Sequence, residues 1–529
     1  MERKPIRRAR DALGIVLLFL AYLVTARLGL LLDAVAGFAT LVWPPSGIAL
    51  AALLLFGTRL WPGVLAGALC VNLIIGASLP VALGIAVGNT LEAVAGSWLL
   101  RRIGRFDPRL ERIDDVKALV LLGAVASTTI SAAVGLLSLR LGGTVASAMS
   151  WPTFRAWWFG DMLGDLVVAP LLLVWISRPA PLRRRFQAPE ALLLAGLLAG
   201  CSWMVFGHGT GDSGLMRLPY LIFPPLLWAA VRFAQYGAVS ANFVISAVAI
   251  AATTLGYGPF VRGTLSESLL HLQIFLAVGA ATALTIAAAI AERSRAVDAR
   301  DEFLAIASHE LRTPLTALHL HIQTELRGLR REAPLERTGA IQRLETTQRM
   351  ALRLERLVDE LLEVSRIIWG RLQPDREDVD LVALVRESLL RQQQELLNAR
   401  CQVHLEVEGA VSGHWDRGRL DRVLDNLIGN AAKYGAGKPI EVRLHGGKEH
   451  VRLEVRDHGI GIDPADQARV FERFERAVSR RQYGGFGLGL WISRKIVEAH
   501  GGTISLMSQP GAGCTFSVEL PRFANPGVN

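Results

Sequence analysis

The chain has 529 residues, of which 51% are hydrophobic and 20% are charged, and its formal net charge is +10. This length allows about three domains, and the two classes of residue are segregated, with residues 12–291 almost continuously apolar and residues 292–529 typical of a soluble protein. Much of the basic excess lies in short loops between apolar runs, which argues against nucleic-acid binding. The four cysteines form no CxxC pair, so neither a zinc site nor a disulfide framework is indicated.

Residues 1–291 predict a polytopic α-helical membrane bundle. A spanning helix needs about 20 apolar residues. The proline pairs Pro44-Pro45 and Pro224-Pro225 interrupt short runs, so eight spans remain an alternative to ten. The long apolar run behind the basic start predicts a retained span rather than a cleaved signal peptide. The ten candidate spans are 12–32, 40–57, 62–79, 81–100, 116–138, 158–177, 190–206, 218–234, 238–257 and 270–291.

Lys and Arg gather in alternate loops of this bundle, for example at 101–112, 177–185 and 292–300. Cytoplasmic loops carry such an excess. We therefore expect a multi-pass membrane protein, in contact with lipid, with both termini in the cytoplasm.

Several polar side chains lie inside the predicted spans. Asp161 and Asp165 share one helix face by their i, i+4 spacing. Intramembrane charges are costly and face a bundle interior, a cavity or one another. One interpretation is structural pairing, for example of Arg27 with an acid. The other is a ligand- or ion-sensing pocket formed by Asp161, Asp165, Glu92 and Arg27.

Two stretches of this region carry a family resemblance. Residues 41–73 contain WPPSG and a WPG turn, and residues 158–173 contain GD-x3-D before a proline. These motifs resemble the MASE-type integral membrane sensor domain of bacterial signalling proteins, over roughly residues 12–290. The resemblance implies a sensor domain in the bacterial inner membrane and supplies no ligand.

A signalling linker at 292–302 and a helical hairpin at 303–370 come next. The linker is polar and permits helix, so the last span is expected to continue as one helix into SHELRTPLT, residues 308–316. A turn is expected at 332–334. Apolar residues in both arms follow the spacing of a coiled-coil seam, so two hairpins are expected to form a four-helix bundle in a homodimer. The seam residues are Leu304, Leu311 and Leu318, then Ala351, Leu354, Val358, Leu361 and Ser365.

His309 lies on the side of the helix opposite the seam and is expected to face solvent. Glu310 can accept a hydrogen bond from its Nδ1–H, which leaves Nε2 free to attack. Thr313 shares the face of His309 and can position a water. Pro314 removes the hydrogen bond to the carbonyl of Glu310, so we expect a bend there.

Residues 375–521 alternate strand and helix patterns, which predicts an α/β sandwich with a mixed sheet covered on one face by helices. No P-loop motif is present. Asn426 and Asn430 share a helix face, and the amide oxygen of Asn430 suits Mg²⁺. Lys433 would meet phosphate charge, and Tyr434 would flank the nucleotide.

Three further elements complete this pattern. Asp457 in DHGIGI can accept from the exocyclic amine of adenine, while Gly459 and Gly461 let the backbone approach the base. VFERFER is expected to be a lid anchored by Phe471 and Phe474. The loop GGFGLGL opens a helix and turns N–H groups towards phosphates; its candidate contacts are Gly485, Gly487, Leu488 and Gly489.

The segment SHELRTPLT matches the phosphoacceptor box of sensor histidine kinases, and the later elements match the nucleotide-binding boxes of the GHKL ATP-binding fold. The resemblance implies ATP and Mg²⁺ as cofactors, autophosphorylation of His309, and transfer to an aspartate of a separate response regulator. It also implies dephosphorylation of that regulator. The lid is shorter than usual, Val478 stands where an acid is common, and residues 522–529 form a tail.

Three alternatives remain at this point: a protein that is mainly a phosphatase through Thr313 and Glu310, a transporter with a regulatory ATPase, and a degenerate scaffold. No receiver domain follows in this sequence, so the regulator is expected to act in trans.

Overall fold

The computed structural model describes residues 3–30, 34–35, 39–40, 42–177, 188–207, 218–261, 265–330, 337–368, 374–435, 437–473, 475 and 488–523. They form two compact units, residues 1–300 and 301–529, each of which is described by itself.

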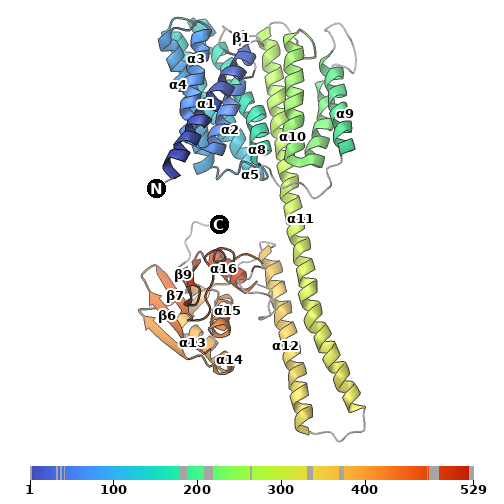
Figure 1. The fold of residues 1–529 in the computed structure, drawn as a ribbon, viewed down its shortest axis with the longest axis vertical. Helices are drawn as coiled ribbons and strands as arrows, with labels where there is room; N and C mark the ends of the chain where they lie inside the picture. Colours follow the sequence, from blue (N-terminus) through green and yellow to red (C-terminus); the bar gives the residue numbers. More distant parts are fainter. Residues whose placement is uncertain are drawn as a thin grey trace. The chain divides into compact units, whose positions relative to one another are not determined.

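The first unit is a bundle of apolar helices (Figure 1). Two of its segments, η2 and η4, are π-helical turns that continue α5 and α7. Its elements are α1 (Arg3–Leu30), β1 (Ala34–Val35), β2 (Ala39–Thr40), α2 (Pro44–Phe56), η1 (Thr58–Leu60), α3 (Trp61–Ile74), α4 (Leu79–Arg102), α5 (Ile113–Ala118), η2 (Leu119–Ser127), α6 (Thr128–Leu141), η3 (Ser147–Met149), α7 (Ser150–Leu163), η4 (Gly164–Val168), α8 (Ala169–Ser177), α9 (Ala188–Phe206), η6 (Pro219–Ile222), α10 (Phe223–Thr254) and the first part of α11 (Leu265–Leu329).

Within the described ranges, seven helical stretches are long and apolar enough to cross a membrane. The predicted spans 40–57 and 62–79 correspond to two shorter apolar helices, Pro44–Phe56 and Thr58–Ile74. The predicted spans 218–234 and 238–257 both fall within α10, which is broken at Ala234 (φ 49°, ψ −134°). The structure thus supports a multi-pass membrane protein, and the choice between eight and ten spans stays a prediction.

Close contact between α2 and α7 depends on two glycines. A Cβ on Gly47 would lie 2.2 Å from the carbonyl oxygen of Gly164, and a Cβ on Gly164 would lie 2.3 Å from that of Trp43. The N–H of Trp43 donates to the carbonyl of Gly160 at 3.0 Å. Only glycine permits such an approach of backbone to backbone. This contact brings the start of α2 beside the aspartates of α7 and η4.

The second unit begins with the phosphoacceptor-like hairpin. Helix α11 runs unbroken from Leu265 to Leu329, as expected for a last span that continues into 308–316, and it includes Pro314. The expected bend at Pro314 therefore does not end the helix. The second arm is α12 (Arg337–Ile368); the predicted turn at 332–334 lies outside the described residues.

An α/β domain follows the hairpin, and its predicted mixed sheet is confirmed. The strand order is β4-β6-β7-β9-β8, with β4 parallel to β6 and every other pair antiparallel. A separate two-stranded sheet, β3 with β5, was not predicted. The elements are β3 (Glu377–Asp380), α13 (Leu381–Arg391), α14 (Gln393–Asn398), β4 (Val403–Glu408), β5 (Ser412–Trp415), α15 (Arg417–Tyr434), β6 (Ile440–Gly446), β7 (His450–Arg456), α16 (Gly489–Ala499), β8 (Thr503–Gln509) and β9 (Gly513–Pro521).

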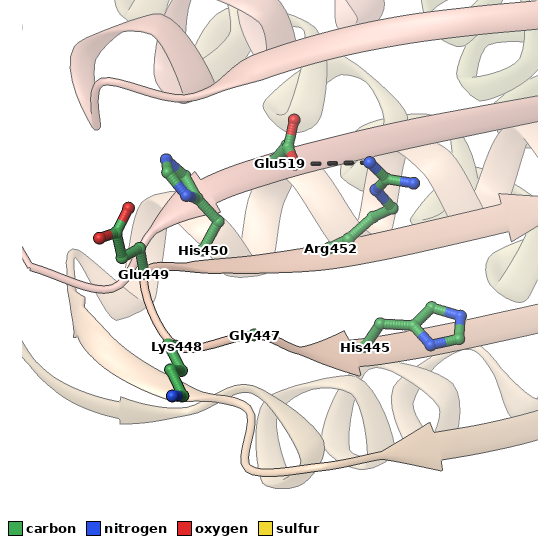
Figure 2. Close-up of a pocket in the computed structure, with 7 residues that line it drawn as sticks. All are labelled: His445, Gly447, Lys448, Glu449, His450, Arg452 and Glu519. Carbon is green, nitrogen blue, oxygen red and sulfur yellow. Dashed lines mark hydrogen bonds and ion pairs between the residues drawn. The ribbon is translucent and has the colours of Figure 1, made fainter.

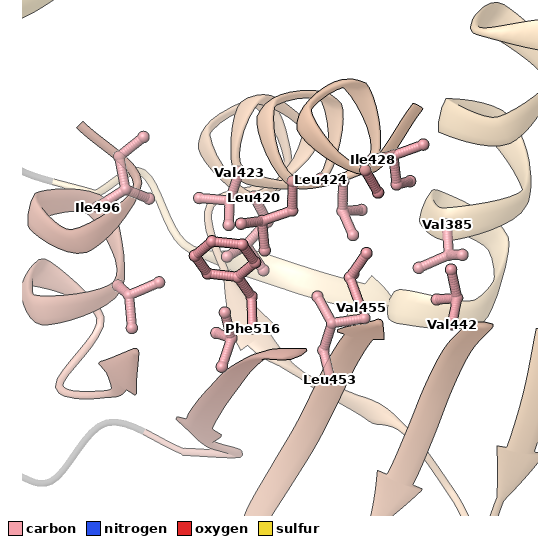
Figure 3. Close-up of a cluster of buried hydrophobic side chains, with 14 of the residues drawn as sticks. Val385, Leu420, Val423, Leu424, Ile428, Val442, Leu453, Val455, Ile496 and Phe516 are labelled. Atoms are coloured by element: carbon pink, nitrogen blue, oxygen red, sulfur yellow. The ribbon is translucent and has the colours of Figure 1, made fainter. Parts of the chain in front are cut away.

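One hydrophobic core joins the helices to one face of the sheet (Figure 3). Alternate residues of β6 and β7 are buried, as the pleat of a half-covered sheet requires. They meet the apolar face of α15, whose buried side chains recur at helical spacing. The labelled core residues are Val385, Leu420, Val423, Leu424, Ile428, Val442, Leu453, Val455, Ile496 and Phe516.

Candidate functional site

Helix α15 carries the first part of the candidate nucleotide site. Asp416 caps its N-terminus by accepting from the N–H of Arg419 at 3.0 Å. Because the apolar face of α15 is held on the sheet, Asn426 and Asn430 are fixed on another face, where both are half-buried. The rigid helix therefore presents two amide groups one turn apart, as their spacing predicted.

Asn426 joins α15 to the start of α16. Its Nδ2 donates to Ser493 Oγ at 2.9 Å, and its Oδ1 accepts from Nδ2 of Asn430 at 3.4 Å. A Cβ on Gly489 would lie only 2.2 Å from Asn426 Oδ1, so α16 can begin here only with glycine. Ser493 was not predicted as a site residue, although it lies one helical turn after Gly489 and so shares its side of α16.

Asp457 lies directly after β7 and is buried. Its Oδ1 accepts from the N–H of Gly459 at 2.8 Å. Burial raises the pKa of the Asp457 carboxyl, while the N–H groups of Gly459 and Cys514 act in the opposite direction. A carboxylate has about four acceptor positions, so Asp457 can still accept from a further donor.

Two glycines press the loop after Asp457 against its neighbours. A Cβ on Gly459 would lie 2.1 Å from the carbonyl oxygen of Tyr434, at the end of α15. Gly461 has φ +69°, and a Cβ there would lie 2.0 Å from the carbonyl oxygen of Gln509. Their place beside a base stays a prediction, and both glycines pack closely against the backbone of neighbouring segments.

The other candidate nucleotide-site residues lie at the end of α15, beyond the Asp457 loop and before α16. The Lys433 Nζ is 5.1 Å from the ring centre of Tyr434. Phe471 is buried and makes an edge contact with Phe516, with ring centres 6.3 Å apart. Leu488 is buried immediately before α16. Four residues named in the sequence analysis lie outside the described part of the chain: Phe474, Val478, Gly485 and Gly487.

His309 lies on α11 and is exposed, as expected for a nucleophile. The Thr313 hydroxyl is also exposed and donates to the backbone carbonyl of His309 at 3.2 Å. The two side chains thus lie one turn apart on the same helix. The backbone of Glu310 is helical, but its side chain is not among those described.

The polar residues of the membrane unit form a second group. Asp161 accepts from Ser46 Oγ at 3.0 Å and from Ser131 Oγ at 2.6 Å. Asp165 and Glu92 are buried beside it and interact with it electrostatically. Arg27 is exposed and forms no ion pair with an acid in the described part of the chain, so the structural pairing considered for Arg27 is not found.

A surface pocket lies at the turn between β6 and β7 (Figure 2), with Arg452 and Glu519 paired at 3.4 Å. This turn is at the opposite end of β7 from Asp457. The pocket is therefore separate from the candidate nucleotide site. Its lining residues are His445, Gly447, Lys448, Glu449, His450, Arg452 and Glu519.

The junction of α15, the Asp457 loop and α16 has the donor set that ATP and Mg²⁺ require. In the described residues, the side-chain oxygen Oδ1 of Asn430 takes part in no hydrogen bond, and a neutral amide oxygen is a suitable Mg²⁺ ligand. Helix α16 begins at Gly489, and the N–H groups at its start would receive phosphate oxygens. When bound, ATP would supply the phosphoryl group, and Mg²⁺ would neutralise phosphate charge.

Comparisons with known proteins agree with this organisation. The MASE1 family model matches residues 14–294, more than half of the chain. The His Kinase A (phospho-acceptor) domain matches residues 299–368. The histidine kinase-, DNA gyrase B-, and HSP90-like ATPase model matches residues 415–524.

Curated relatives are similar over the second half of the chain. Sensor-like histidine kinase SenX3 of Mycolicibacterium smegmatis is 33% identical over 243 residues, which cover 44% of this chain and 61% of that protein. Signal transduction histidine-protein kinase BarA of Escherichia coli K12 is 35% identical over 249 residues, which cover 43% of this chain and 25% of that protein. The chain thus spans less than two thirds of the length of these relatives.

Among solved structures, the histidine kinase AdeS of Acinetobacter baumannii is 26% identical, with a TM-score of 0.34 over 40% of this chain and 98% of that one. The three family models, in their order along the sequence, identify the family. This chain belongs to the sensor histidine kinases and carries a MASE1 membrane domain followed by HisKA and HATPase domains.

Proposed function

We propose that the chain is an ATP-dependent protein-histidine kinase that transfers the γ-phosphoryl group of ATP to Nε2 of His309. The observation that carries this proposal is the junction at Asn426, where α15 meets Ser493 and Gly489 of α16, while the loop of the buried Asp457 packs on the end of α15. Such a junction holds polar groups in fixed positions, and phosphoryl transfer depends mainly on positioning and on neutralisation of charge. An exposed histidine on a rigid helix is an accessible acceptor.

In this proposal each element has its own task. Asp457 accepts from the adenine amine, with Gly459 and Gly461 against the base and Tyr434, Phe471 and Leu488 around it. Asn430 is the Mg²⁺ ligand, and Lys433 and the N–H groups near Gly485, Gly487 and Gly489 receive the phosphates. Asn426 holds this arrangement together through Ser493.

The phosphoryl group would then pass to an aspartate of a separate response regulator, and the same hairpin would form a homodimer. Support for the dimer comes from apolar side chains that the single chain leaves exposed along both arms, including Leu304, Leu315, Leu344, Val358 and Leu362. Burying such a stripe against a second copy is favourable. The MASE1 domain would lie in the inner membrane with both termini in the cytoplasm.

Dephosphorylation of the regulator belongs to the same proposal. Thr313 lies one turn from His309, and both are exposed. With Glu310, its hydroxyl can orient a water towards a phosphoryl group held near His309. Replacement of Thr313 by Ala would then slow loss of label from a phosphorylated regulator and leave the labelling of His309 in place.

The test uses full-length protein in lipid nanodiscs, incubated with labelled ATP and Mg²⁺. We expect label that is labile in acid and stable in alkali, since it is a phosphoramidate. Replacement of His309 by Gln should abolish it, whereas His319→Gln, an exposed histidine on the same helix, should keep it. Equal labelling of the wild type and the His309→Gln variant would contradict the proposal.

A further inference from the structure

Three acids of the membrane unit lack the positively charged partners that buried acids usually have. Glu92 on α4, Asp161 on α7 and Asp165 on η4 are 2%, 1% and 1% exposed. Their strongest interactions are with one another, with the hydroxyls of Ser46 and Ser131, and with the indole of Trp157. None of these is a lysine, an arginine or a histidine.

Several oxygens of this group are unpartnered. Both carboxyl oxygens of Asp165, Oε2 of Glu92 and Oδ1 of Asn89 are buried without a hydrogen-bond partner among the described residues. The Nδ2 of Asn89 donates to Tyr22 Oη at 2.8 Å. Ionised carboxylates in such a place would be strongly destabilised. The negative charge of the cluster must therefore be neutralised by a bound proton or cation.

The titratable groups around the cluster come from four helical elements, α1, α4, α7 and η4. Tyr22 of α1 interacts with Asp161 and Glu92, Glu92 of α4 with both aspartates, and Asp165 with Asp161. The facing groups of α2 and α6 are the hydroxyls of Ser46 and Ser131, which carry no charge. Within the described chain, the side chains are not arranged as a metal site. A proton can neutralise a carboxylate without a cavity or a coordination shell.

Ser131 provides a way for a proton to change the structure. Its Oγ lies 2.6 Å from Asp161 Oδ2 and 3.0 Å from the carbonyl oxygen of Thr128. A hydroxyl has one proton and can donate to only one of them at a time. When Asp161 is ionised, Ser131 donates to it. When Asp161 is protonated, Asp161 donates to Ser131, which is then free to donate to Thr128.

We propose that Glu92, Asp161 and Asp165 form a proton-binding site inside the membrane bundle, with Ser131 as the hydroxyl that changes its hydrogen-bond partner when the site gains or loses a proton. Because Asp161 also holds Ser46 of α2, the exchange alters contacts among α2, α6 and α7. That these contacts control phosphorylation of His309 rests on the proposed function.

The site itself is tested by pH-difference infrared spectroscopy of the full-length protein in lipid nanodiscs. The wild type should show a carbonyl-stretch band of protonated carboxyl groups at neutral pH that is lost at higher pH. Glu92→Gln, Asp161→Asn and Asp165→Asn should each remove part of this band. Asp114→Asn, at an exposed acid of the same unit, should leave it unchanged. A wild type without the band, or a band that is the same in all three variants, would overturn the proposal.

Ser131→Ala keeps all three acids and so tests the exchange without removing a carboxyl. It should shift the midpoint of the band by about one pH unit, since a hydrogen bond to one protonation state is lost; an unchanged midpoint would rule out the role of Ser131.

The pH profile of His309 labelling in Asp161→Asn and in Asp114→Asn tests the coupling. A titrating band with no labelling in any variant would contradict the kinase alone, and labelling with no band would contradict the proton site alone.

Discussion

A buried carboxylate of the second unit, Glu363, and one of the membrane unit, Asp165, have different surroundings. In the second unit, Glu363 of α12 is 6% exposed, and its two oxygens accept from Arg419, at 2.8 Å, and from Arg422. Asp457 of the same unit accepts from a backbone N–H. In the membrane unit, neither oxygen of Asp165 has a partner among the described residues. A paired carboxylate can remain ionised and join two elements, whereas an unpaired one requires a proton or a ligand. Burial alone therefore does not distinguish a structural acid from a functional one; the donors around it do.

The largest expected effect tests the fixed junction of the second unit at Gly489. Gly489→Ala places a methyl group 2.2 Å from Asn426 Oδ1, so the amide must rotate and lose its bond to Ser493. We expect the affinity for a non-hydrolysable ATP analogue to fall about 10- to 100-fold by calorimetry. Gly429→Ala on α15 meets its nearest neighbour at 3.5 Å and should bind normally. Normal binding by both variants would mean that the junction is not part of the site.

The contribution of the paired carboxylate to stability can be tested at Glu363. Glu363→Gln leaves two arginines without a carboxylate, and we expect a loss of about 2 kcal/mol, less than for a fully buried pair because Arg422 is 40% exposed. Hydrogen exchange in α12 and α15 of the full-length protein should accelerate about 30-fold. The exposed Glu355 of the same helix gives a control, Glu355→Gln, with no change. Unchanged exchange in both variants would show that paired and unpaired acids do not differ in this way.

The pH dependence of ATP affinity tests the role of the buried Asp457. In the proposed function the ionised carboxylate of Asp457 accepts from the adenine amine, and burial raises the pKa of Asp457. Affinity should therefore fall on acidification, starting at a higher pH than for an ordinary aspartate. Asp457→Asn should weaken binding about tenfold at neutral pH, since a hydrogen bond to a charged group is lost, and should flatten the pH profile. A wild-type affinity that stays constant down to pH values near the ordinary pKa of an aspartate would contradict this expectation.

The smallest effect is expected at Ser493. Ser493→Ala removes one hydrogen bond of 2.9 Å to Asn426 and should weaken binding of the ATP analogue about three- to tenfold in the same titration. Ser505→Ala, at an exposed position on β8, serves as the matched control and should bind as the wild type does. A loss as large as that of Gly489→Ala would indicate that Ser493 contacts the nucleotide directly.

Local spacing was sufficient to predict the elements whose signal is local. The i, i+4 amides of α15 share a helix face, and the mixed sheet of β4, β6, β7, β8 and β9 forms within the residues 375–521 whose alternation predicted it. The β3–β5 pair was missed because its strands are only four residues long. The break of α10 at Ala234 is a backbone conformation that the residue type does not signal.

Long-range partners could not be predicted in the same way. Asp161 receives its hydrogen bonds from Ser46 and Ser131, which are 115 and 30 residues away in the sequence. The same holds for Ser493, 67 residues from Asn426. Sequence spacing identified the acids and amides, and only the fold identifies what they contact.

The central claim is that ATP held at the junction of α15 and α16 phosphorylates His309. Its most direct test is tandem mass spectrometry, under alkaline conditions that preserve phosphohistidine, of the full-length protein after incubation with ATP and Mg²⁺. We expect a phosphoryl group on His309 in the wild type and in Gly429→Ala, with a strong reduction in Gly489→Ala. A phosphoryl group on another residue, or undiminished phosphorylation of His309 in Gly489→Ala, would contradict it.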